Sequence, residues 1–177
     1  SHTGELTMVE GLVRWNDSRT NTQRGAQEVL HAASMTDSLF ELTRITLERG
    51  MADLVAIHAA GLTHVGLAIN LNPEQLCDTE LVSFVRSVLE QFLIQPRLLT
   101  LEVTEDAILH DEDIVVAQLR ALDQLGVSLA IDDFGVGYSS LARLQKLPFD
   151  SVKIDKIFLE NVPANDRRVQ FYKAIVD

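Results

Sequence analysis

Five polar residues are candidates for chemistry because each lies near the end of an apolar, strand-like stretch. They are Glu10, Asn70, Glu102, Asp132 and Lys153. Carboxylate and amide oxygens together are the ligands that hard divalent cations such as Mg²⁺ and Mn²⁺ prefer. A single residue of this kind is usually a cap or a turn former. Five in register favour a site, because buried carboxylates need compensation. The five histidines are scattered and we interpret them as structural or surface residues, so nothing indicates zinc.

Strands and helices alternate along the chain and must position these residues. The apolar patterns predict strands over residues 5–15, 65–71, 98–103, 127–132 and 151–154. They predict helices over residues 37–49, 78–92, 111–125, 139–147 and 166–176, the first with Asp37 as its N-cap and Gly50 just past its end. This alternation implies a parallel sheet, either open or closed into a barrel.

The predicted strands share a face pattern. Alternate side chains of a strand point to opposite faces. Four of the predicted strands have aliphatic residues on one face and a smaller or more polar face on the other, which carries the polar candidate near its carboxyl end. In the strand over 5–15, Glu10 shares one face with Leu6, Met8, Leu12 and Arg14. In parallel β/α folds, the loops at the carboxyl ends of the strands build the site. We therefore expect the five candidates to converge on one mouth.

The segment after the fourth predicted strand carries two adjacent carboxylates, Asp132 and Asp133. Adjacent side chains point apart on a strand, so Asp133 can join Asp132 only if the chain turns there. Gly135 and Gly137 permit such a turn, and the backbone N–H groups of this loop could receive a phosphate. A plain connection between a strand and a helix is the alternative interpretation.

Composition limits the classes of partner. The 177 residues suffice for one domain, and the formal net charge of −11 would repel a nucleic-acid polymer. The protein could still bind a small anionic substrate if metal ions or a nearby arginine offset the negative charge of its surface. Charge alone favours a solvated acidic surface with no such role. No apolar run approaches the roughly 18 residues of a membrane span, and the start has no signal-peptide pattern. Cys77 is the single cysteine, which excludes an internal disulfide. We therefore expect a cytoplasmic domain.

The same segments resemble the EAL family of cyclic di-GMP phosphodiesterases. The similar segments are residues 10–15, 67–72, 102–105, 132–140 and 147–155. The first is similar to the motif that names the family, with Gly11 where alanine is usual. The fourth, an Asp-Asp-Phe-Gly loop, is highly specific.

The resemblance implies a fold, an activity and a set of site residues. The fold would be α/β, a modified TIM (β/α)8-type barrel with one antiparallel strand. Two divalent ions, Mg²⁺ or Mn²⁺, would cleave cyclic di-GMP to linear pGpG. The implied metal ligands are Glu10, Asn70, Glu102, Asp132 and Asp133. Lys153 would contact the attacking water or the phosphate, and Glu105 would anchor the 132–140 loop; with Asp133 they form the implied catalytic set. Leu12 and Arg14 would touch the substrate.

The chain is shorter than a complete domain of this family. A typical (β/α)8 barrel takes about 250 residues, so we expect residues 1–177 to form a single, incomplete EAL-like domain that lacks the first strand and the last two. We expect little turnover from this chain alone. The alternatives are a catalytically inactive cyclic di-GMP receptor and a protein-interaction module. A homodimer could cover the open edges, and a longer parent protein could carry fused sensory or GGDEF domains or a membrane tether.

Overall fold

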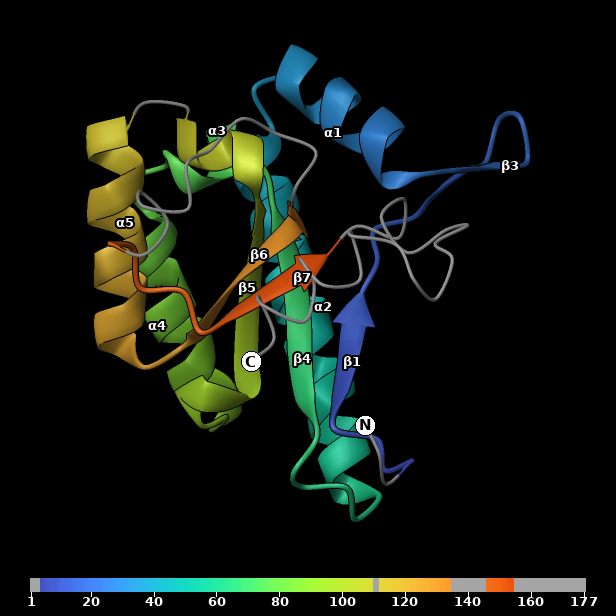
Figure 1. Cartoon of the computed structure of the whole chain (residues 1–177). Helices are drawn as coiled ribbons and strands as arrows, with labels where there is room; N and C mark the ends of the chain where they lie inside the picture. The colour runs from blue at the N-terminus through green and yellow to red at the C-terminus, as the bar shows by residue number, and fades with distance from the viewer. Residues whose placement is uncertain (1–3, 110–111, 135–145, 155–177) are drawn as a thin grey trace, which may run out of the picture.

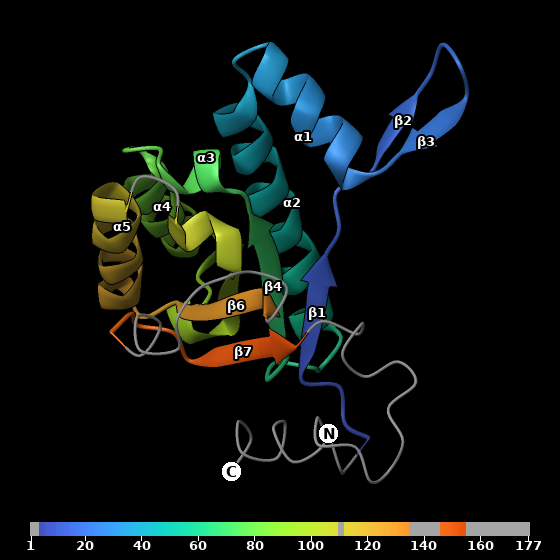
Figure 2. The ribbon, with the colours of Figure 1, turned by 45° about the horizontal axis from the view of Figure 1, so that its top comes forward.

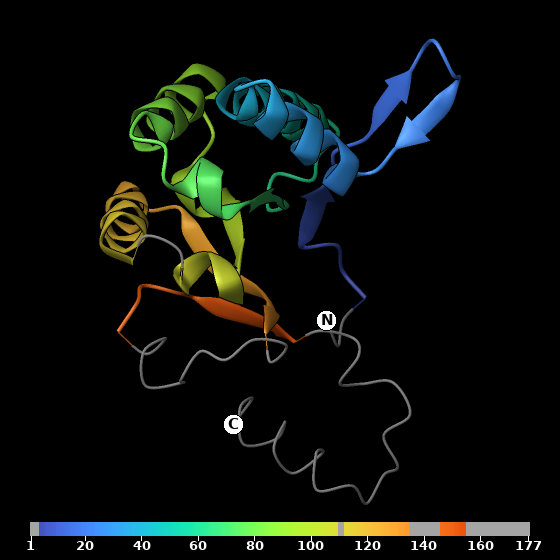
Figure 3. The ribbon, with the colours of Figure 1, turned by 90° about the horizontal axis from the view of Figure 1, so that it is seen from above.

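A five-stranded parallel sheet organises the chain. The computed structural model describes residues 4–109, 112–134 and 146–154. The strands, in their spatial order, are β1 (Met8–Gly11), β4 (Gly66–Leu71), β5 (Leu99–Thr104), β6 (Ser128–Phe134) and β7 (Ser151–Ile154). Figure 1 shows them side by side, and Figure 3 shows that they curl like part of a barrel wall. The predicted α/β class with a parallel sheet is confirmed. Every pairing described in this sheet is parallel, so the implied antiparallel strand does not appear among the described strands of this sheet.

Three helices cover the outer, convex face of this sheet (Figure 3). They are α2 (Leu39–Ala59), α4 (Leu81–Phe92) and α5 (Glu112–Leu125). The helices α1 (Ala26–Met35) and α3 (Pro73–Leu76) and the short 3-10 turn η2 (Glu105–Leu109) lie toward the carboxyl ends of the strands (Figure 1), and the 3-10 turn η1 (Pro96–Leu98) precedes β5. The aliphatic face of each central strand packs against the covering helices, as the face pattern predicts. Leu67 and Ile69 of β4 and Leu99 and Leu101 of β5 are all buried. Among the described helices, none is both long and apolar enough to cross a bilayer.

The predicted helix over 37–49 is wrong at both ends. Asp37 is not the N-cap: it has φ 53°, in the left-handed region between α1 and α2, and Ser38 is the N-cap of α2. Gly50 does not follow the helix, because α2 continues to Ala59. A Cβ at Gly50 would lie 2.9 Å from Leu67 Cδ2, so the glycine lets α2 pack close to β4.

The predicted strand over 5–15 is also longer than the observed one. Only Met8–Gly11 pairs in the main sheet. The chain then forms an antiparallel hairpin, β2 (Trp15–Asp17) and β3 (Thr22–Arg24), which projects from the body of the molecule (Figure 2). The sequence analysis predicted neither this hairpin nor α1.

The remaining predicted elements agree with the structure where it describes them. The strands over 65–71, 98–103, 127–132 and 151–154 are present, as is the helix over 111–125. The helix predicted over 78–92 begins at Leu81, after the short helix α3. The helix predicted over 166–176 lies outside the described residues. So does the one over 139–147, except for residues 146 and 147, which are not helical.

Candidate functional site

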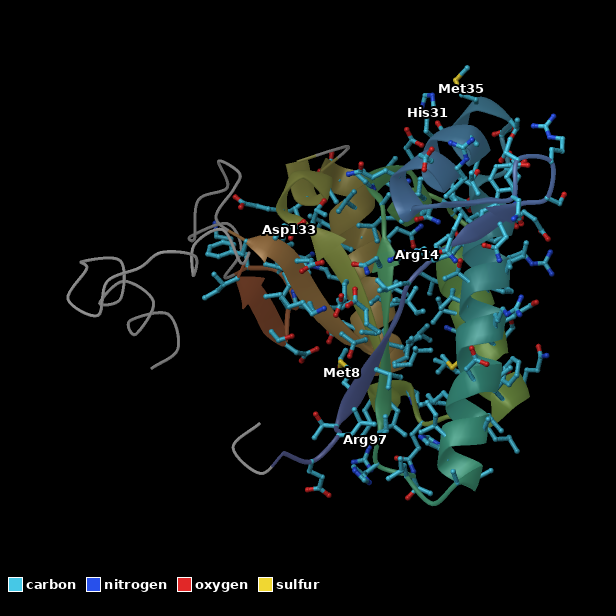
Figure 4. All side chains as sticks on the ribbon, turned by 90° about the vertical axis from the view of Figure 1, so that its right-hand side faces the viewer. Met8, Arg14, His31, Met35, Arg97 and Asp133 are labelled. Carbon is cyan, nitrogen blue, oxygen red and sulfur yellow. The ribbon has the colours of Figure 1, made fainter. Side chains whose placement is uncertain are left out.

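The carboxyl ends of β1, β4 and β5 bring three of the candidates into neighbouring positions. In the register of the sheet, Asn70 is opposite Glu102, and Glu10 is opposite Ala68, two residues before Asn70. Asn70 Nδ2 donates to Glu10 Oε1 at 2.8 Å, which joins β1 to β4. Met8 and Glu10 are exposed whereas Val9 and Gly11 are partly buried, as the face pattern predicts. Figure 4 shows Met8 on the side of β1 away from α2.

Glu102 and Lys153 form the second contact of the site. Lys153 Nζ on β7 donates to Glu102 Oε2 at 2.6 Å, and the glutamate residue is only 1% exposed. The other carboxylate oxygen, Glu102 Oε1, is buried and has no hydrogen-bond partner within the described part of the chain. A buried oxygen of this kind is costly unless something satisfies it.

The pKa values indicate that four charged groups share this environment. Burial raises the pKa of Glu102 above its ordinary value of 4.5; the hydrogen bond and charge of Lys153 oppose the rise, and the charges of Asp132 and Glu10 add to it. Burial alone would lower the pKa of Lys153, but the hydrogen bond and charge of Glu102, with the charges of Glu10 and Asp132, raise it above 10.5. Glu10 and Asp132 therefore lie close enough to act on the Glu102–Lys153 pair.

The end of β6 contains an irregularity that involves both aspartates. Ile131 is opposite Val152 and Phe134 is opposite Ile154, so Asp132 and Asp133 together face the one residue Lys153. This two-against-one pairing is a β-bulge, a feature that re-aims side chains near active sites. Asp133 has φ 54°, in the left-handed region, and the strand continues to Phe134. The change of direction therefore lies at Asp133 itself (labelled in Figure 4), and Gly135 and Gly137 are outside the described residues.

The other predicted site residues flank this group. Glu105 is 3% exposed and begins η2, directly after β5. Most of the 132–140 loop that Glu105 would anchor lies outside the described residues. Leu12 is 56% exposed on the segment after β1, and Arg14 Nη1 donates to Val13 O at 2.8 Å (Figure 4).

A cavity beside Asn70 involves residues that the sequence analysis missed. It has a volume of about 60 Å³, and Gly11, Leu12, Asn70, Thr43 and Gln75 contribute to its lining. Thr43 and Gln75 are buried and hydrogen-bonded to each other. The pattern Asn72-Pro73-Glu74-Gln75 is a capping-box signal that could have revealed Gln75, whereas no local pattern indicates Thr43.

The candidate side chains have the ligand atoms that a hard divalent cation prefers, although the described residues do not form a complete coordination site. Within residues 4–109, 112–134 and 146–154, no three Cys, His, Asp or Glu side chains come together as a metal-binding group. The candidates form two contacts instead, Asn70 with Glu10 and Lys153 with Glu102. Most of the candidate ligand atoms are oxygens. The buried Glu102 Oε1 accepts no hydrogen bond from the described residues, and a bound cation would satisfy it instead.

Comparisons with known proteins point to one family. The EAL domain model matches residues 1–177. Cyclic di-GMP phosphodiesterase NbdA of Pseudomonas aeruginosa is 39% identical over 173 residues, which cover 98% of this chain and 22% of NbdA. The structure of the P. aeruginosa MucR phosphodiesterase in a c-di-GMP complex has a TM-score of 0.86 and 31% identity, over 98% of this chain and 70% of that chain. The EAL domain of Mycobacterium smegmatis DcpA has a TM-score of 0.70 and 33% identity, over 77% of this chain and 61% of that one. The chain spans about a fifth of the length of NbdA.

Proposed function

Because this chain belongs to the EAL domain family, we propose that it carries the catalytic residues of a cyclic di-GMP phosphodiesterase, which hydrolyses the cyclic dinucleotide to linear pGpG. The similarity to NbdA and to the MucR phosphodiesterase supports this substrate. The observation that carries the proposal is the grouping of Glu10, Asn70, Glu102 and Lys153 at the carboxyl ends of parallel strands. Such a grouping is where β/α proteins place their active sites.

We propose that two divalent cations, Mg²⁺ or Mn²⁺, are held at this mouth. The proposed ligands are Glu10, Asn70, Glu102, Asp132 and Asp133. When bound, such ions lower the pKa of an attacking water and neutralise charge on the phosphate. The orphaned Glu102 Oε1 is the atom in the structure that most favours this assignment. The amide of Asn70 already uses its nitrogen toward Glu10, which leaves its oxygen as the atom to offer a cation.

We propose that Lys153 contacts the phosphate or the attacking water. Because its pKa lies above 10.5, its ammonium group is charged at neutral pH. Glu102 holds Nζ at 2.6 Å and therefore orients it within the mouth. A fixed positive charge there would stabilise the negative charge that develops on the phosphate oxygens.

Leu12 and Arg14 are the proposed substrate contacts, and both follow β1 at the same mouth. Leu12 offers exposed apolar surface, suited to a nucleobase. The guanidinium of Arg14 is exposed and bound to the carbonyl oxygen of its neighbour Val13, so turning it toward a phosphate would cost little.

The proposed assembly extends beyond this chain. We propose that the domain functions as a homodimer and within a longer protein that carries further signalling domains. MucR, a bifunctional diguanylate cyclase/cyclic di-GMP phosphodiesterase that is 31% identical over 173 residues, supports the second point.

The experiment that tests the function measures product directly. The longer protein that carries this domain is incubated with cyclic di-GMP and Mg²⁺ or Mn²⁺, because we expect little turnover from this chain alone, and pGpG is separated by ion-exchange chromatography. We expect product with either metal and none with EDTA, and a loss of about a hundredfold or more for Asp132→Asn. Binding of cyclic di-GMP in calorimetry without any product would instead favour the receptor alternative. A protein that neither binds cyclic di-GMP nor forms product would contradict both the phosphodiesterase proposal and the receptor alternative.

A further inference from the structure

A buried hydrogen-bonded network joins α2 to the turn that follows β4. Gln75 Nε2 donates to Thr43 Oγ1 at 2.8 Å, and Thr43 Oγ1 donates to Leu39 O at 3.0 Å. The other end of the same amide, Gln75 Oε1, accepts from Asn72 N at 3.0 Å. Thr43 is 2% exposed and Gln75 is 6% exposed, so water does not compete for these bonds.

The network fixes the backbone directly after a proposed ligand. Asn72 lies two residues beyond Asn70, and its Oδ1 accepts from Gln75 N at 2.7 Å, so Asn72 and Gln75 hold each other through two bonds. Pro73 restricts the first residue of α3 further. The carboxyl end of β4 is thereby tied through Gln75 and Thr43 to the 21-residue helix α2.

The cavity beside this network explains why the bonds matter for position. Asn70, Thr43 and Gln75 all border the space of about 60 Å³, together with Gly11 and Leu12 at the end of β1. Close-packed neighbours would hold the strand end by contact alone. Here packing beside Asn70 is incomplete, so the hydrogen bonds add restraint at the strand end.

We infer that Gln75 and Thr43 are positioning residues for Asn70, which hold its amide at the proposed metal site through the Asn72 turn. This inference rests on the proposed function for the role of Asn70 as a ligand. Gln75 bonds to Asn72 and to Thr43, so each residue would act on Asn70 through the backbone that follows β4. Groups that orient a metal ligand typically change metal affinity by about 10–100-fold when removed.

A matched pair of substitutions tests the inference. Gln118 is also buried, and its Nε2 donates to Asp78 O at 2.7 Å, beyond the end of α3 and not to the Asn72 turn. Gln75→Leu and Gln118→Leu therefore each remove one buried glutamine amide. We expect Gln75→Leu to weaken Mn²⁺ binding about tenfold in isothermal titration calorimetry. We expect Gln118→Leu to change it by less than about twofold, whatever it does to the melting temperature.

The hydroxyl of Thr43 offers a second comparison. Thr43→Val keeps the shape but removes the hydroxyl, whereas Thr43→Ser keeps the hydroxyl. We expect Thr43→Val to weaken Mn²⁺ binding as Gln75→Leu does, Thr43→Ser to retain it, and the double variant Thr43→Val/Gln75→Leu to be no weaker than either single one. Folded Thr43→Val and Gln75→Leu proteins with wild-type affinity would overturn the inference.

Hydrogen exchange separates this inference from the proposed function, because it needs no metal. In the metal-free protein, Gln75→Leu should speed exchange of the amides of residues 70–72 about tenfold or more relative to Gln118→Leu. Wild-type protein that binds no Mn²⁺ would contradict the proposed metal site, and the exchange rates would still decide whether Gln75 positions this strand end. Equal exchange in the two variants would overturn the inference even if the metal site is correct.

Discussion

Lys153 Nζ lies 2.6 Å from Glu102 Oε2, so a lysine on β7 neutralises a buried carboxylate two strands away on β5. The contact joins residues that are 51 positions apart in the sequence. It satisfies one oxygen of Glu102 and leaves the other, Oε1, without a hydrogen-bond partner in the described part of the chain. The pair therefore holds Glu102 in a fixed orientation with one oxygen still to be satisfied.

The first prediction concerns the pH dependence of stability in metal-free protein. Because the folded-state pKa of Glu102 is raised above 4.5, the folded protein binds a proton there that the unfolded chain has already lost. Its contribution to the unfolding free energy is full below pH 4.5 and is lost as pH rises through the raised pKa. We subtract the unfolding free energy of Glu102→Gln from that of the wild type, both measured by urea unfolding in EDTA. This difference should fall as pH increases from about 4.5. A difference that grows over that interval would reverse the sign and contradict the assignment.

The second prediction concerns the partner of that carboxylate. Lys153→Met leaves the charge of Glu102 buried without its cation, which is strongly destabilising for fully buried pairs. Lys153 is partly exposed, with 41% of its side chain accessible, so we expect a smaller loss of about 2 kcal/mol at pH 7. Urea denaturation without metal measures it. The double variant Lys153→Met/Glu102→Gln should recover part of the loss; if it is as unstable as the sum of the single variants, the pair does not interact.

The third prediction concerns the shared metal site. Asp132 is opposite Thr104, two residues past Glu102, so it lies at the carboxyl end of the same strands. We expect Asp132→Asn to weaken Mn²⁺ binding at least about tenfold, because the cation loses a charged ligand. Asp123→Asn, on the exposed surface of α5, makes the same change of net charge and serves as the control. An affinity within twofold of wild type for Asp132→Asn would exclude Asp132 as a ligand.

The fourth prediction separates Glu105 from the ligands. It lies three residues past Glu102, after the end of β5, and is buried at the start of η2. We expect Glu105→Gln to lower the melting temperature and the hydrolysis rate while Mn²⁺ affinity stays within about twofold. A metal-bound crystal structure with Glu105 in the coordination sphere would show that it is a ligand instead.

The fifth prediction concerns Gly11, where the EAL motif usually has alanine. A Cβ at Gly11 would meet Ile69 Cδ1 at 2.5 Å, so Ile69 occupies the space that the methyl group would need. That contact is the tip of a flexible side chain, and both residues border the cavity of about 60 Å³. We therefore expect Gly11→Ala to fold normally, with a change in unfolding free energy below about 1 kcal/mol. Gly11→Val should cost about 1–3 kcal/mol, as overpacking does; equal costs for both would mean that the cavity does not accommodate Ile69.

Local patterns were sufficient for the strands that carry the candidate site. Side chains alternate on a strand regardless of what surrounds it, so the shared faces of Glu10, Asn70 and Glu102 followed from the positions of their aliphatic neighbours. Amphipathic spacing in the same way predicted α5 almost to the residue. The motif after β6 carried enough specificity to indicate the EAL family, which the matching family model confirms.

Contacts between distant segments decided the features that the sequence analysis missed. Gly50 has the local signature of a helix end, yet it lies within α2 because β4 packs against it there. The bulge at Asp132 and Asp133 exists only as a mismatch with β7, and the bond between Thr43 and Gln75 links segments 32 residues apart. The sequence by itself determined which faces are polar, because that depends on neighbouring residues along one strand. Only the tertiary structure decided which polar groups satisfy one another, because burial removes water and leaves each group to the partners that packing brings within about 3 Å.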